Sequence, residues 1–297
     1  MDMKQLKYFY TIACEGQVTK AAKKLHMAQP PLSQQLKLLE QELGVTLFER
    51  HRRTMTLTQA GEVLFTKAER LLQEMEEVRM EVRDRGEGLS GTLAIGTVKS
   101  CFAYLPAQMQ QFRTQYPNVR FSLHDGDSYR ISELVKNRTV ELGLVRLPLP
   151  LSEFAHIRLP DEPFVVVFPA GWRLPQSGNS LSMADLREVP LLLLHRVHGT
   201  GQYEMVLDAC RAHQFEPNVV CECPDVTLLL ALVANGVGAT IVPKSTLETF
   251  RPPGVEVFSL VDTTLEAKAA IIWLSRRYLS KQARRLIARF KEGVSVC

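Results

Sequence analysis

The chain has 297 residues, of which 45% are hydrophobic and 23% are charged, and its formal net charge is +4. This composition is typical of a globular protein and excludes a disordered or fibrous chain, and the length predicts at least two domains. No stretch approaches the ~18 consecutive apolar residues of a membrane span, and the N-terminus lacks the apolar core of a secretion signal, so we expect a cytoplasmic protein without membrane contact.

Charge is unevenly distributed along the chain. Residues 1–58 hold nine Lys or Arg against five Asp or Glu, residues 59–88 hold five against eight, and residues 89–297 hold twenty-two against nineteen. A compact basic unit ahead of a nearly neutral body suits phosphate contact at one end and a small or uncharged partner at the other. A basic surface that only faces solvent would carry the same charge, so motifs are needed to decide whether the unit binds nucleic acid.

Three helices and a basic hairpin are predicted at the start of the chain. Apolar residues recur at helical spacing over residues 6–13 and 18–25, and Gly16 separates the two stretches. A third helix starts near Pro30, where a missing N–H group costs little, and ends at Gly44. Its leucines recur every three or four residues and should face a core: Leu32, Leu36, Leu39 and Leu43. With the hairpin that follows, this pattern predicts an all-α winged helix-turn-helix head.

The third helix and the hairpin are the candidate DNA interface. The N-terminal half of a recognition helix enters the major groove, where glutamine can pair with adenine and lysine supplies charge. Arginines of the hairpin suit phosphates or the neighbouring minor groove. The candidate DNA contacts are Gln29, Pro30, Ser33, Gln34, Gln35, Lys37, Arg50, Arg52 and Arg53.

A long charged helix follows the head. Its apolar positions alternate in steps of four and three, as in a coiled-coil seam. They are Leu64, Ala68, Leu71, Met75, Val78 and Val82. The seam predicts dimerisation with a second copy of the chain, and the alternative is a helix packed on its own domain. Gly86, Gly88 and Gly91 then mark a domain boundary.

Predicted strands and helices alternate through the rest of the chain. Strands over residues 92–96, 119–124 and 141–146, with a helix in each interval, predict a parallel sheet, and the theme repeats over residues 164–242. Two α/β lobes leave a cleft, where small ligands usually bind. The predicted domains are a DNA-binding domain (1–58), a linker helix (59–88) and an effector-binding domain (89–297), with lobes of 89–161 plus 266–297 and of 162–265.

The cysteines and histidines give little support for a metal or an enzyme. Six cysteines are scattered through a chain without an export signal, so reduced thiols are expected. Cys221-Glu222-Cys223, His195 and His198 lack the further ligands of a zinc site, so neither a metal nor another cofactor is expected. Common nucleophile, metalloprotease and dinucleotide motifs are absent, which argues against an enzyme. Cys101 and Cys210 are candidates for a thiol sensor.

Several segments together resemble the LysR-type transcriptional regulators over the whole chain. The segments are Leu6–Phe9, Thr19–Leu25, Gln29–Leu36, Leu39–Arg50, Leu57–Glu62, Leu105-Pro106, Tyr116-Pro117 and Leu232–Pro243. The resemblance implies a sensor domain similar to the type 2 periplasmic binding proteins. It also implies a homotetramer, as a dimer of dimers, acting on double-stranded promoter DNA, with RNA polymerase as a candidate further partner.

The resemblance also implies a small-molecule effector between the two lobes, most closely as in relatives that sense aromatic or muconate-type carboxylates. The matching positions hold Lys99, Ser100, Cys101, Ser128, Arg146, Gly201, Tyr203, Asp225 and Val226. A guanidinium at Arg146 can hold a carboxylate through two hydrogen bonds, and the alternative is that Arg146 pairs with an acid of the protein. An organic acid is therefore the expected effector, and a thiol-responsive regulator of the same architecture is the alternative.

Overall fold

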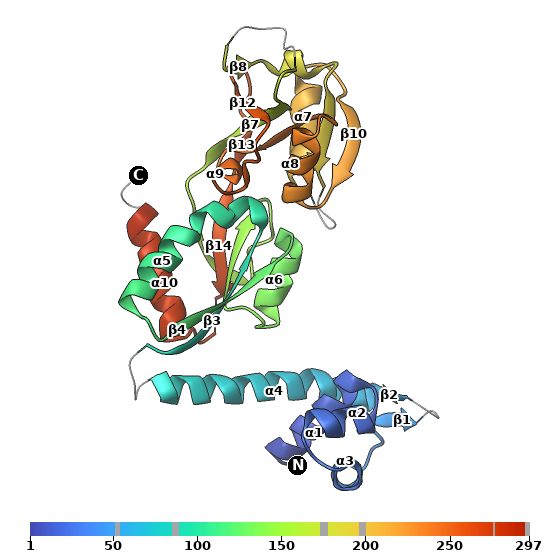
Figure 1. Ribbon diagram of the computed structural model, residues 1–297. Coiled ribbons are helices and arrows are strands. Elements are labelled where there is room, and N and C mark those ends of the chain that lie inside the picture. Colours follow the sequence, from blue (N-terminus) through green and yellow to red (C-terminus); the bar gives the residue numbers. More distant parts are fainter. Residues whose placement is uncertain (51–53, 85–88, 173–177, 196–199, 276, 295–297) are drawn as a thin grey trace. The chain divides into compact units, whose positions relative to one another are not determined.

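The computed structural model describes residues 1–50, 54–84, 89–172, 178–195, 200–275 and 277–294. The chain forms two compact units, which we call the head unit (Met1–Glu87) and the sensor unit (Gly88–Cys297) (Figure 1). No helix among these residues is long and apolar enough to cross a membrane.

The head unit packs three short helices and a hairpin against the start of a long helix. Its elements are α1 (Met3–Glu15), α2 (Val18–Lys24), α3 (Gln29–Leu43), β1 (Phe48–Arg50), β2 (Met55–Leu57) and α4 (Gln59–Asp84). α3 ends at Gly44, whose φ of 67° lies in the left-handed region that glycine adopts readily. The predicted leucine stripe is buried at Leu32, Leu36 and Leu39. Leu43 is exposed instead, because it is the last residue of the helix.

The first half of α4 belongs to the core of the head unit. Ala68 is fully buried there, and Phe65 stacks on Tyr10 of α1 with ring centroids 4.9 Å apart. The predicted seam is therefore divided, since Ala68 contacts its own domain, whereas Leu71, Val78 and Val82 are 42%, 60% and 67% exposed.

The first lobe of the sensor unit is a five-stranded sheet in the order β4-β3-β5-β14-β6. Its elements are β3 (Gly91–Thr97), η1 (Lys99–Tyr104), α5 (Pro106–Gln115), β4 (Val119–Asp125), α6 (Ser128–Lys136), β5 (Leu142–Arg146), β6 (Phe154–Arg158), β14 (Ala269–Leu274) and α10 (Lys281–Val294). Figure 1 shows β14 of this sheet between α6 and the pair α5 and α10. α6 lies close to the sheet at Gly143, where an added Cβ would stand 2.8 Å from the Ile131 side chain. Any larger residue at this position would push α6 outward.

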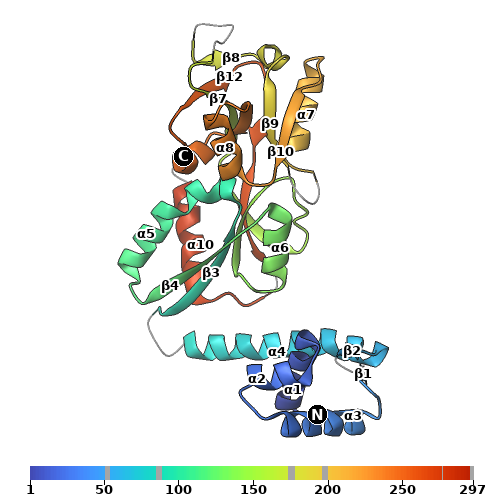
Figure 2. The same ribbon diagram turned by 45° about the vertical axis from the view of Figure 1, so that its right-hand side comes forward.

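The second lobe is built on a larger sheet in the order β10-β9-β11-β7-β12-β8, with β13 paired to β7 (Figure 2). Its elements are β7 (Glu162–Pro169), β8 (Ser180–Leu181), η2 (Met183–Leu186), β9 (Pro190–Leu194), α7 (Gln202–Ala212), β10 (Asn218–Cys223), α8 (Val226–Ala234), β11 (Ala239–Pro243), α9 (Thr246–Phe250), β12 (Val255–Leu260) and β13 (Glu266–Ala267).

Both sheets are mixed, whereas the alternating pattern predicted parallel sheets. β3, β4 and β5 are parallel, as are β9, β10 and β11. β14 and β7 run antiparallel to these sets. Each enters directly from the other lobe without a crossover helix, and a crossover helix is what returns a chain in the parallel direction. The parallel arrangement predicted for residues 92–146 is confirmed for β3, β4 and β5, whereas β7, the first predicted strand of residues 164–242, is antiparallel to the strands that follow it.

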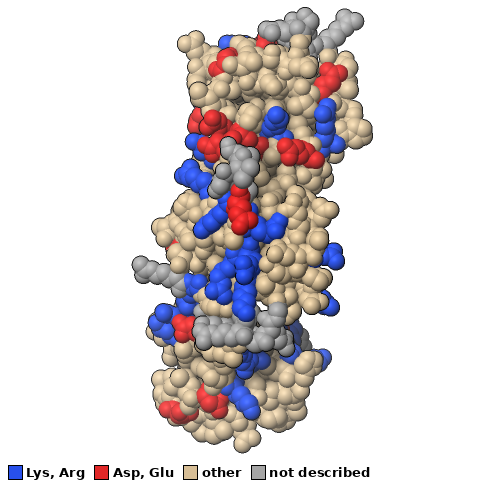
Figure 3. Space-filling view, turned by 90° about the vertical axis from the view of Figure 1, so that its left-hand side faces the viewer, with Lys and Arg blue, Asp and Glu red and all other residues tan. Residues whose placement is uncertain are grey.

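The closing helix α10 is amphipathic. Its apolar face, with Leu286 and Phe290, packs in the first-lobe core. Arg284, Arg285 and Lys291 are exposed on the other side, and Figure 3 shows Lys and Arg gathered over this lobe. The apolar face therefore holds α10 on the first lobe.

Candidate functional site

The N-terminal half of α3 carries a polar surface. Gln29, Pro30, Gln34 and Lys37 are exposed, and Ser33 and Gln35 are half-buried. The leucines of the helix point into the core, so these side chains point away from it. Ala28 provides no side-chain cap, and prolines occupy the first positions of the helix. The surface offers amide, hydroxyl and ammonium groups at the N-terminal end of the helix, and in a recognition helix this end reaches into the major groove.

The hairpin beside α3 is attached to the head unit through its backbone. β1 and β2 are antiparallel, with Arg50 opposite Met55, and the Met55 N–H donates to the Gly16 carbonyl at 2.8 Å. The backbone of Arg50 therefore lies at the end of β1. Arg52 and Arg53 lie outside the described residues.

A cavity of about 600 Å³ in the sensor unit is lined by both lobes. Its apolar walls come from Val98, Leu147, Phe164, Leu194, Met205 and Pro243. Six of the predicted effector residues line it: Lys99, Ser100, Ser128, Arg146, Asp225 and Val226. This volume and this mixture of apolar and polar walls suit a small organic ligand.

Three predicted effector residues have other positions. Cys101 is fully buried in the first-lobe core. The Gly201 N–H donates to Glu204 within its own helix start, and the Tyr203 hydroxyl donates to Glu222 at 2.8 Å. Gln202 lines the cavity in place of its two neighbours, because successive residues on a helix point about 100° apart.

Sequence reasoning missed several polar residues of the lining. They are Asp125, Asp127, Tyr129, Arg130, Glu133, His195, Gln202 and Lys268. Asp127 carried a recognisable signal, because an aspartate before an amphipathic run is a typical N-cap. It caps α6 by accepting from the Arg130 N–H at 2.7 Å.

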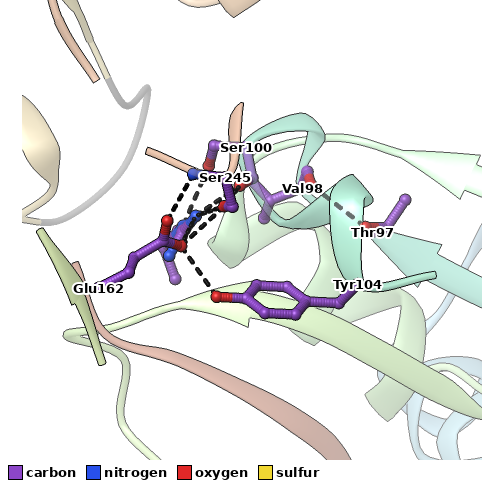
Figure 4. A network of polar contacts seen from close by, with 7 residues as sticks. Thr97, Val98, Ser100, Tyr104, Glu162 and Ser245 are labelled. Carbon is purple, nitrogen blue, oxygen red and sulfur yellow. Dashed lines mark hydrogen bonds and ion pairs between the residues drawn. The ribbon is translucent and has the colours of Figure 1, made fainter. Parts of the chain in front are cut away.

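Arg146 is part of a buried polar network that joins the lobes (Figure 4). Its Nη2 lies 2.8 Å from Oε1 of Glu162 and donates to the Ser245 hydroxyl at 3.1 Å, and its Nε donates to the Ser100 hydroxyl at 3.3 Å. Glu162 also accepts from the Tyr104 hydroxyl at 2.9 Å. Burial and the Glu162 carboxylate raise the pKa of the Tyr104 phenol. The alternative in which Arg146 pairs with an acid of the protein is therefore the observed arrangement.

The helix starts at the cavity are occupied by acids of the protein. Asp225 caps α8 by accepting from the Thr227 N–H at 2.8 Å and the Leu228 N–H at 3.2 Å. Ser128, at the start of α6, donates to the Arg146 carbonyl at 2.9 Å. The resemblance implied that Ser128 and Asp225 contact the effector, and both already have partners within the protein.

Lys99 forms an ion pair with Asp225 across the two lobes. Its Nζ also lies 3.6 Å from Oδ2 of Asp125. Burial alone would raise the pKa of Asp225, but the Lys99 ammonium and the hydrogen bonds from residue 227 lower it to about 2. The hydrogen bond to Asp225 raises the pKa of Lys99. Both groups are therefore charged at neutral pH.

The candidate thiols are poorly placed to react. Cys210, like Cys101, is fully buried, and burial raises the pKa of its thiol to about 11. A protonated thiol without solvent contact is a weak nucleophile. Among the described residues, no group of three or more His, Cys, Asp or Glu side chains could hold a metal ion.

Both units match known protein families. Residues 3–62 match the bacterial regulatory helix-turn-helix protein, lysR family, and residues 86–295 match the LysR substrate binding domain. The chain is 36% identical over 291 residues to the HTH-type transcriptional regulator BsdA of Bacillus subtilis (strain 168), covering 98% of this chain and all of that protein. It is 32% identical over 246 residues to the HTH-type transcriptional regulator ClcR of Pseudomonas putida, covering 82% and 83% of the two.

A solved structure is also similar to this chain over its full length. Full-length CbnR complexed with its target DNA matches with a TM-score of 0.72 at 27% identity, covering 99% of both chains. The helix-turn-helix head followed by a two-sheet α/β domain, as predicted from the sequence, is confirmed by these matches.

Proposed function

Because the chain belongs to the LysR family of DNA-binding transcriptional regulators, which are not enzymes, we propose that a small organic acid bound between the lobes of the sensor unit controls its action at a promoter. The observation that carries this proposal is the cavity of about 600 Å³, with apolar walls from both lobes and cations in its lining. An acid with an apolar body would bury that body and meet a cation at one end.

The proposal changes the role expected for Arg146. Its guanidinium pairs with Glu162, so an effector carboxylate would have to replace a buried charge pair. Removing one partner of a buried pair is strongly unfavourable. We therefore assign Arg146 to positioning the lobes, and we place the acid in the part of the cavity that holds Lys99.

The head unit supports a sequence-specific DNA contact through α3. Gln34 and Gln35 can reach adenine in the major groove, and Lys37 and the hairpin arginines can contact phosphates. The exposed part of the seam, with Leu71, Val78 and Val82, supports pairing of α4 between two copies of the chain. A dimer, and a dimer of dimers built from it, would present several heads to promoter DNA.

The thiol-responsive alternative lacks a supporting observation. Cys101 and Cys210 are both fully buried, and they lie in the cores of different lobes. Oxidation favours exposed thiolates with a resolving thiol nearby. The burial of both thiols and their separation therefore argue against a thiol sensor.

Thermal unfolding of the full chain against a panel of carboxylic acids tests the proposal. An acid at a hundred times its Kd should stabilise the sensor unit by about 2.7 kcal/mol, because it binds only the folded state. The panel contains benzoate, phenylacetate, succinate and adipate, each beside its uncharged amide. Stabilisation by an acid and not by its amide supports an anionic effector. Absence of any shift with all four acids contradicts the proposal.

A further inference from the structure

One ion pair crosses the cavity from lobe to lobe. Lys99 is the first residue of η1 in the first lobe, and Asp225 is the N-cap of α8 in the second. Their ammonium and carboxylate are in direct contact, and both residues line the cavity. The Lys99 side chain is 33% exposed and that of Asp225 is 25% exposed, so a ligand in the cavity could reach both.

The partners of Lys99 distinguish it from two other cations of the lining. Arg146 pairs with Glu162, and Lys268 lies 3.9 Å from Asp161. Neither of these acids lines the cavity. Lys99 instead pairs with carboxylates that do line it, so its present partners occupy space that a ligand carboxylate would use.

Asp225 could release Lys99 without being left unsatisfied. Its Oδ2 faces Lys99, whereas its Oδ1 accepts from the N–H groups of Thr227 and Leu228 at the start of α8. A carboxylate that keeps these hydrogen bonds and the positive end of a helix remains stable as an anion. The exchange of one carboxylate for another on Lys99 therefore leaves every charge with a partner.

We propose that Asp225 occupies the place of the effector carboxylate in the ligand-free protein, and that an incoming acid takes Lys99 from Asp225 and so breaks the ion pair between the lobes. The proposal rests on the proposed function, in which an acid binds in this cavity. It makes Lys99 the residue that selects an anionic ligand. It also couples acid binding to the position of the lobes, because Lys99 can pair either with the acid or with Asp225 of the other lobe.

Asp225→Asn is the informative variant, because asparagine can still cap α8 while the charge that competes for Lys99 is removed. The Kd of each acid of the panel is measured by titration calorimetry on the full chain. We expect the acid that binds to do so about tenfold more tightly in this variant, equivalent to about 1.4 kcal/mol. We expect Lys99→Met to lose the preference for the acid over its amide.

Two further variants separate the ion pair from a general change of charge. Asp208→Asn makes the same charge change on α7, where Asp208 is 76% exposed and lies 3.6 Å from Arg211, and it should leave the Kd unchanged. Asp125→Asn removes a 69% exposed acid on the same lobe as Lys99, and it should tighten binding much less than Asp225→Asn. Equal tightening by Asp125→Asn and Asp225→Asn would overturn the exchange, because a more positive cavity would then explain both.

The outcomes also separate this proposal from the one on which it rests. Binding of an acid to the wild type that Asp225→Asn leaves unchanged overturns the exchange and keeps the effector site. Absence of binding to both proteins contradicts the effector site itself. Binding to the wild type that becomes tighter in Asp225→Asn supports the exchange, because the internal carboxylate then competes with the acid for Lys99.

Discussion

At the scale of single residues, Gln34 and Lys37 should contribute different kinds of binding energy to DNA. Both are exposed on α3, but an amide can read a base edge, whereas an ammonium is suited to a phosphate. Gln34→Ala should reduce the binding free energy by about 1–3 kcal/mol and relax the base preference at one position of the operator. Lys37→Ala should weaken binding to all DNA sequences alike, and it should reduce the slope of log affinity against log salt concentration by about one. Fluorescence anisotropy on an operator selected from random DNA, with single-base variants at several salt concentrations, measures both. The same uniform loss in both variants would contradict the assignment of α3.

Residue identities at the sensor site were partly predictable from the sequence. Lys99, Ser128 and Asp225, which the family resemblance implied as effector contacts, line the cavity, and each lies just after a strand or at the start of a helix. The partners of Arg146 could not be predicted, since Glu162 follows it by sixteen residues and belongs to the other lobe. The sequence shows that a side chain is charged, but the identity of its ion-pair partner depends on how the two lobes pack together.

At the scale of elements, the exposed part of α4 should be the dimer contact. Leu71 and Val78 lie on the seam and are exposed, whereas Ala68 belongs to the head core. Leu71→Glu with Val78→Glu should yield monomers, because two buried like charges per chain would oppose pairing. Val63→Glu is the matched control, since Val63 is 64% exposed on the same helix and lies off the seam. Sedimentation velocity measures the outcome, and dimers that persist in the double variant would contradict the assignment.

The elements themselves were predicted better than their pairing. The spacing of apolar residues placed α3, α8 and the central strands, because periodicity is a local property of the chain. Strands β6 and β12 were missed, and both pair antiparallel with a strand distant in the sequence. Their partners, β14 and β7, are the strands that enter from the other lobe, through Lys268 and through residues 159–161. No local pattern contains that information.

At the scale of the whole molecule, acid binding and DNA binding should be linked. If the acid changes operator affinity by some factor, operator DNA must change acid affinity by the same factor. We expect a factor of about 5–150, which corresponds to a coupling of about 1–3 kcal/mol. The operator Kd is measured with and without the acid, and the acid Kd with and without the operator. Lys99→Met should lose the effect of the acid on operator affinity.

The linkage also identifies the step that the acid controls. A regulator whose acid Kd is unchanged by DNA, while a reporter gene responds to the acid, would act after DNA binding, for example through contact with RNA polymerase. If the acid changes operator affinity and the operator changes acid affinity by the same factor, the acid instead controls DNA binding itself. Asp225→Asn then gives a second test, because breaking the pair with Lys99 should move operator affinity without acid in the direction in which the acid moves the wild type. A variant that leaves operator affinity unchanged, in a protein whose acid does change it, would show that the ion pair selects the ligand without holding the lobes.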